Sequence, residues 1–175
     1  MQKRKELAVL LAVLVVLLAS CTRQRNMDAA EFCRRFNVLQ NAETLTSDMF
    51  FKETAEASGT YDCNFTFAEG HTALLTLTAR EDGTITALQL TCIPQGEAAY
   101  TAETFSALYT CFVRLVCVLA VCDTENDALD LVHTAGIAED RLAFADSGYT
   151  GETDGFTYAL FSGTQYLSLF CSRTR

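Results

Sequence analysis

The chain has 175 residues, half of them hydrophobic, and its 13 basic and 22 acidic side chains give a formal net charge of −9 at pH 7. This length suits one domain with its own hydrophobic core. Because phosphate binding requires clustered lysine and arginine side chains, the acidic balance argues against nucleic acid as a partner.

The first 21 residues carry the most specific pattern in the chain. A basic start is followed by an apolar run from Leu7 to Leu18, which is shorter than the roughly 20 apolar residues of a membrane span. The run ends in Leu-Ala-Ser directly before Cys21. This order resembles the lipobox of bacterial lipoproteins, and the resemblance implies cleavage after residue 20 and attachment of fatty acyl chains such as palmitate to Cys21. The alternatives are an ordinary cleaved signal that contains a cysteine by chance, and an uncleaved anchor helix.

This resemblance divides the chain into a signal peptide (residues 1–20), a lipidated tether (21–27) and a single domain (28–175). Cleavage removes three basic side chains and one acidic side chain, so the remaining charge is 10 minus 21, or −11. We therefore expect a protein that is anchored by lipid to a bacterial cell membrane or envelope, on its extracytoplasmic side. Basic residues near the anchor either contact anionic headgroups or are simply solvated: Arg23, Arg25, Arg34 and Arg35.

The domain is predicted to begin with an amphipathic helix over residues 28–40, because apolar residues recur there at helical spacing. From residue 60 the period changes to two, which predicts a three-stranded antiparallel meander over 60–68, 72–80 and 84–93. One face of the meander is apolar: Tyr61, Phe65, Phe67, Leu75, Leu77, Leu88 and Leu90. The other face is rich in threonine: Thr60, Thr66, Thr76, Thr78, Thr84 and Thr86.

Thr101 is predicted to cap a long helix over residues 102–122, which is apolar almost all round and should be the central core helix. The alternative, a second membrane span, is disfavoured by Arg114 in its middle. Capping-box spacing at Thr124 predicts a short helix through His133 that ends near Gly136. Alternation over 156–161 and 165–171 predicts a C-terminal hairpin.

The order of helix, meander, long helix with a short extension, and hairpin predicts an α+β fold with its helices on one face of the sheet. This order is similar to that of type III secretion chaperone-like folds. The similarity is one of topology, and it implies an acidic domain that offers a sheet face or a helix to a partner.

Eight cysteines occur, and lipidation of Cys21 leaves seven as buried core residues or as members of one or two disulfides. In a continuous helix Cys111, Cys117 and Cys122 are too far apart to pair with one another. Cys63 and Cys92 are expected at opposite ends of the meander, so they should not pair either.

Motifs for zinc binding, phosphate binding and hydrolysis are missing from the sequence. The segment 146–155 is expected to be a flexible loop, and its carboxylates Asp146, Glu152 and Asp154 either bind calcium or belong to an ordinary polar loop. No other cofactor or metal is expected.

We expect a binding or interaction module that contacts a partner through this loop and through the threonine-rich face, in particular Thr66, Thr76 and Thr78. The membrane, through the lipid on Cys21, and an envelope or extracellular protein are the expected partners. An enzyme of unrecognised type, such as a hydrolase that uses the loop carboxylates, and a purely structural envelope lipoprotein remain the alternatives. The threonine-rich face is otherwise the solvated side of a one-layer sheet.

Overall fold

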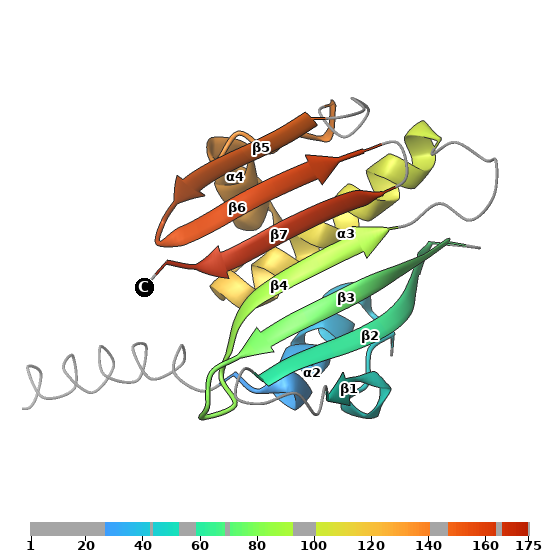
Figure 1. The fold of residues 1–175 in the computed structure, drawn as a ribbon, viewed down its shortest axis with the longest axis vertical. Coiled ribbons are helices and arrows are strands. Elements are labelled where there is room, and N and C mark those ends of the chain that lie inside the picture. The colour runs from blue at the N-terminus through green and yellow to red at the C-terminus, as the bar shows by residue number, and fades with distance from the viewer. Residues whose placement is uncertain are drawn as a thin grey trace, which may run out of the picture.

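The computed structural model describes residues 27–42, 44–52, 59–68, 71–92, 101–140, 147–163 and 166–174. These residues form one seven-stranded antiparallel sheet with helices packed on one of its faces, an α+β fold as predicted (Figure 1). The elements follow in the order α2 (Ala29–Gln40), the 3-10 turn η1 (Ser47–Met49), β1 (Phe51–Lys52), β2 (Gly59–Ala68), β3 (His71–Ala79), β4 (Ile85–Cys92), α3 (Ala102–Ala120), α4 (Glu125–Thr134), β5 (Ser147–Thr153), β6 (Phe156–Ser162) and β7 (Leu167–Arg173).

Each helix begins at the capping residue that the sequence provides. The side chains of Asp28 and Thr101 accept hydrogen bonds from backbone amides in the first turns of α2 and α3. Thr124 and Asp127 form the complete capping box of α4. The predicted helices are therefore confirmed, although α3 ends at Ala120, two residues earlier than expected.

The strand order β1-β2-β3-β4-β7-β6-β5 joins the predicted meander and the predicted hairpin into one sheet. The joint is the pairing of β4 with β7, in which Leu88 lies opposite Cys171 and Leu90 opposite Leu169. The hairpin partner β5 pairs with β6 along its whole length and forms one edge of the sheet. Helices α2, α3 and α4 lie behind the sheet in Figure 1, with α2 behind β2 and β3 and with α4 behind β5 and β6.

The core lies between the sheet and the helices. Its largest fully buried side chains include Phe32 and Phe36 of α2, Phe112 of α3, and Leu75 and Leu77 of β3. Among the described helices, α3 alone is long and apolar enough to cross a membrane, and 61% of its most apolar window is buried inside the fold. We conclude that α3 is the central core helix, as predicted, because its apolar surface is covered by the sheet and the other helices.

Two strands were not predicted. β1 is only two residues long and pairs with β2, so it offers too few residues for a periodic pattern. β5 occupies most of the segment that the sequence assigned to a flexible loop, and this prediction is wrong. The reason is the two-residue turn Asp154-Gly155, in which both φ angles are positive (49° and 75°), as in the type I′ turns that close tight hairpins.

Candidate functional site: the open face of the sheet

The face of the sheet that points away from the helices forms a continuous surface across six strands (Figure 1). The strand register arranges its side chains in three rows that run from β2 to β5. The first row is Thr60, Thr78, Ala87, Ser172, Thr157 and Glu152; the second is Asp62, Thr76, Gln89, Phe170, Ala159 and Thr150; the third is Asn64, Leu74, Thr91, Ser168, Phe161 and Gly148. We call these three rows the open face.

The open face carries little charge. Its ionisable side chains are Asp62 and Glu152, and each of these carboxylates accepts a hydrogen bond from a threonine on the neighbouring strand, Thr76 and Thr157 respectively. The rest of the surface combines hydroxyl, amide and apolar side chains, of which Phe161 is 44% exposed. Such a surface can offer hydrogen bonds to a partner while few charges have to lose their water.

A polar cluster lies where β4 meets β7, near the centre of the open face. The Gln89 side-chain amide donates to the hydroxyls of Ser168 (2.9 Å) and Thr91 (3.2 Å), which lie 3.1 Å from each other. Gln89 is exposed, whereas Ser168 is buried. The two hydrogen bonds hold the Gln89 amide at the surface in one orientation. Sequence reasoning missed this cluster, since it depends on a pairing between strands that are far apart in the chain.

The structure brings several of the predicted contact residues onto this one face. Thr76 and Thr78 stand on β3, and Glu152 lies in the same row as Thr78, at the opposite edge of the sheet. Thr66 lies beyond the third row, opposite Thr72, and is exposed. Thr84, in contrast, is buried before the start of β4, so its predicted place on the threonine-rich face is wrong.

The remaining predicted site residues are placed differently. Asp154 is in the tight turn between β5 and β6 rather than in a long loop, and Glu152 belongs to β5. Asp146 and Cys21 lie outside the described residues. Within the part of the chain that the structure describes, no three His, Cys, Asp or Glu side chains are grouped so that they could hold a metal ion.

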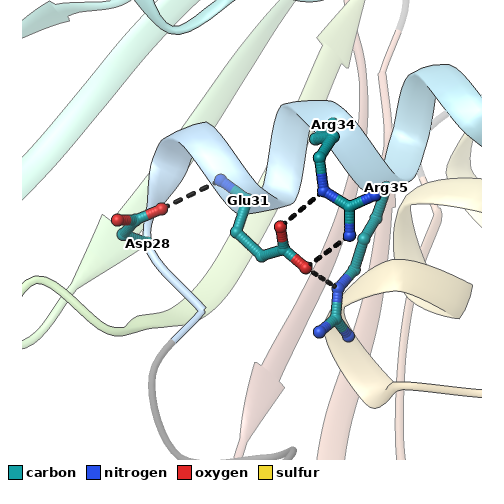
Figure 2. Close-up of polar contacts among 4 residues, drawn as sticks. All are labelled: Asp28, Glu31, Arg34 and Arg35. Carbon is teal, nitrogen blue, oxygen red and sulfur yellow. Dashed lines mark hydrogen bonds and ion pairs between the residues drawn. The ribbon is translucent and has the colours of Figure 1, made fainter.

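A groove of about 230 Å³ lies on the helical side, between α2 and the end of α3. It is lined by Arg34, Arg35, Val38, Leu39, Cys117, Val118, Val121 and Cys122. Figure 2 shows both arginines converging on Glu31: Arg34 donates to its two carboxylate oxygens (2.7 and 2.8 Å), and Arg35 donates to one of them (2.6 Å). The hydrogen bond from Arg34, together with the smaller effect of the hydrogen bond from Arg35, lowers the pKa of Glu31 to about 2. Both arginines belong to α2, the helix that follows the predicted tether.

The cysteines of the described residues are free thiols, and all except Cys122 are buried. Burial raises the pKa of Cys33 to about 11 and the pKa values of Cys111 and Cys171 to about 12, so these thiols stay protonated at neutral pH. The prediction that buried cysteines fill the core is confirmed for them. The position predicted for Cys63 is wrong, because it lies in the middle of β2 opposite Leu75 rather than at one end of the meander.

The two histidines do not form a catalytic set with these thiols among the described residues. The ring of His71, the first residue of β3, lies 3.3 Å from the hydroxyl of Thr104 and stacks on Phe67. His133 is in the last turn of α4, as predicted, and stacks on Tyr109. Both rings are therefore used in contacts between elements of the fold.

Comparison with known proteins yields no match to a protein-family model, to a curated protein or to a solved structure.

Proposed function

We propose that this protein is a membrane-anchored extracytoplasmic binding module and that its open face is the surface that contacts an envelope or extracellular protein. The observation that carries the proposal is the contrast between this nearly uncharged sheet face and the strongly acidic chain that bears it. Among the described residues, no helix lies on the open face (Figure 1).

The location of the acidic side chains supports the assignment. Six of them lie on or beside α4, on the helical side of the sheet: Asp123, Glu125, Asp127, Asp130, Glu139 and Asp140. This separation makes the open face less costly to dehydrate than the surface around α4, because buried charges are costly and the centres of interfaces are depleted of them.

The dimensions also suit a protein partner. Six strands spaced about 4.8 Å apart give a face about 24 Å wide. Leu74, Phe161 and Phe170 provide apolar contact area, and the hydroxyl and amide groups between them supply adaptable hydrogen bonds. A small ligand would instead require a concave site that encloses most of its surface.

The anchor is proposed from the lipobox resemblance and has a direct test. Growth of cells on labelled palmitate should label the full-length protein, and Cys21→Ser should abolish the label. Cys122→Ser is the matched control, because it replaces a half-buried cysteine of the folded domain and should leave the label unchanged. Equal labelling of the wild-type protein and Cys21→Ser would refute the anchor.

The contact surface is tested by chemical crosslinking in intact cells that carry the tagged full-length protein. Thr78→Lys places a charge on the open face, whereas Thr134→Lys introduces the same charge at the exposed end of α4. We expect Thr78→Lys to lower capture of the partner by roughly tenfold, about 1.4 kcal/mol of binding free energy, and Thr134→Lys to leave it unchanged. The proposal fails if both variants capture the partner as the wild type does, or if Thr134→Lys alone loses it.

A further inference from the structure

The end of α3 departs from the continuous helix that the sequence predicts. Val121 adopts the left-handed conformation (φ 58°, ψ 45°), which is unusual for a β-branched residue. The amide of Val121 donates to the carbonyl of Val118 (3.2 Å), and the amide of Cys122 donates back to the carbonyl of Cys117 (2.9 Å). This pair of bonds is a Schellman motif, which turns the chain sharply back over the last turn of the helix.

The reversal brings two cysteines together. In a Schellman motif the residue after the left-handed position packs against the residue whose carbonyl it bonds, usually as an apolar pair. Here these two residues are Cys122 and Cys117. The Cys117 thiol donates to the carbonyl oxygens of Cys122 (3.8 Å) and Thr124 (3.4 Å), so Cys117 contacts the chain segment that contains Cys122. The prediction that these cysteines cannot pair assumed one continuous helix through residue 122. This assumption is wrong, because α3 ends at Ala120, before Cys122.

The ionisation of the pair is uneven. The hydrogen bond with Cys122 is the largest influence on the pKa of Cys117 and lowers it, against burial and the carboxylates of Glu125, Asp127 and Asp123. The same hydrogen bond, with burial, raises the pKa of Cys122. The pair therefore has one thiol that ionises more readily beside a second thiol that remains protonated.

The pair borders an open groove. Both cysteines line the groove between α2 and α3; Cys122 is half-buried, and Cys117 is buried but in contact with the groove. Cys33 and Cys63 also lie near each other, but both are buried in the core. Within the described chain, Cys117 and Cys122 therefore combine proximity with access from solvent.

We propose that Cys117 and Cys122 are a redox-active pair that forms a reversible disulfide by exchange with an external disulfide. The thiolate of Cys117, which lines the groove, attacks one sulfur of the external disulfide, forms a mixed disulfide and releases one external thiolate. Cys122 then gives up its proton, attacks the Cys117 sulfur, closes the internal disulfide and releases the second external thiolate. The two cysteines lose two protons and two electrons, and the external disulfide gains both as two thiols. This inference does not depend on what the open face binds.

Oxidised glutathione is a suitable probe. The full-length protein is purified in detergent under reducing conditions, incubated with increasing oxidised glutathione, quenched with acid, alkylated in denaturant and digested with trypsin. The tryptic peptide 115–141 contains Cys117 and Cys122 and no other cysteine. We expect this peptide to change from a doubly alkylated form to an unalkylated form that lacks two hydrogen atoms, and we expect dithiothreitol to reverse the change.

The comparison with the other cysteines sharpens the test. Peptide 115–141 should be half oxidised at a glutathione disulfide concentration roughly tenfold lower than any peptide that carries Cys33, Cys63 or Cys171. Cys117→Ser should leave a single alkylated cysteine in peptide 115–141, whereas Cys111→Ser, a matched change earlier in the same helix, should leave the oxidation unchanged.

The wild-type measurement does not depend on whether the variants fold. If the folded wild-type protein, monitored by circular dichroism, keeps both cysteines alkylated at every oxidant concentration, the proposal is refuted. It is also refuted if the internal disulfide appears only after urea has unfolded the protein.

Discussion

Gly151 on strand β5 gives the sharpest stability prediction. A Cβ atom added at Gly151 would lie 1.9 Å from the carbonyl oxygen of Ala135, 2.7 Å from its carbonyl carbon and 3.0 Å from its Cα. Ordinary contacts begin at 3.4 Å, so the overlap with the oxygen is 3.4 minus 1.9, or 1.5 Å. Because Ala135 contributes backbone atoms at the end of α4, no rotation of a side chain can relieve the overlap. Either β5 or the end of α4 has to move.

The expected cost of Gly151→Ala follows from this overlap. Overpacking of well-packed positions costs about 1 to 3 kcal/mol, and the reduced freedom of the unfolded chain returns about 0.4 to 1 kcal/mol. We therefore expect the free energy of unfolding in urea to fall by about 1 to 2 kcal/mol. Gly148→Ala on the same strand is the control, because its added Cβ would meet Phe161 at an ordinary 3.5 Å, and it should be neutral or slightly stabilising. Equal stability of the two variants would show that β5 does not pack beneath the end of α4.

Two further changes test the core and the surface. Tyr158→Phe should raise the free energy of unfolding by about 1 kcal/mol, because the buried Tyr158 hydroxyl has no nitrogen or oxygen atom as a hydrogen-bond partner among the described residues. If urea unfolding instead shows that the variant is less stable than the wild type, this hydroxyl does have such a partner. Glu31→Gln should lower the free energy of unfolding by up to about 1 kcal/mol at pH 7. The pKa of Glu31 in the folded protein is about 2, below its usual value of 4.5, but exposed ion pairs contribute little to stability. This contribution is present above pH 4.5 and is lost as the pH falls toward 2, so urea unfolding of the wild type and the variant should converge there. If the wild type and Glu31→Gln differ in stability by the same amount at every pH, the difference does not come from the charge of Glu31.

Much of the fold could be predicted because local patterns and tertiary packing agree. The caps at Asp28, Thr101 and Thr124 mark the helix starts, and alternation over residues 60–93 marks β2 to β4. The threonines of β3 were placed on the correct face, because a strand with one buried side alternates strictly.

The parts that were missed depend on contacts that a local pattern does not carry. β5 has Gly151 where a strand usually has a bulky inward residue, and the close approach of Ala135 explains why a glycine stands there. Val121 ends α3 in a conformation that β-branched residues disfavour, so neither the end of the helix nor the meeting of Cys117 with Cys122 could be predicted from propensity. The Asp154-Gly155 turn, in contrast, is a hairpin signal that the sequence does contain.

The rows of the open face could not be derived from sequence either. They require β4 to pair with β7, a contact between residues almost 80 positions apart, such as Gln89 and Ser168. Two separate stretches of alternating residues become one surface only through this pairing. The threonines of β3 were therefore predictable, but their continuity with Glu152 was not.

The central claim is that the open face contacts a partner protein, and site-specific photocrosslinking in intact cells tests it most directly. A photoreactive amino acid at Gln89, exposed at the centre of the open face, is compared with the same amino acid at Asp130, exposed on α4. We predict that position 89 yields a reproducible crosslinked protein and that position 130 does not. Crosslinking of the same protein from position 130 alone, or of none from position 89, would contradict the account.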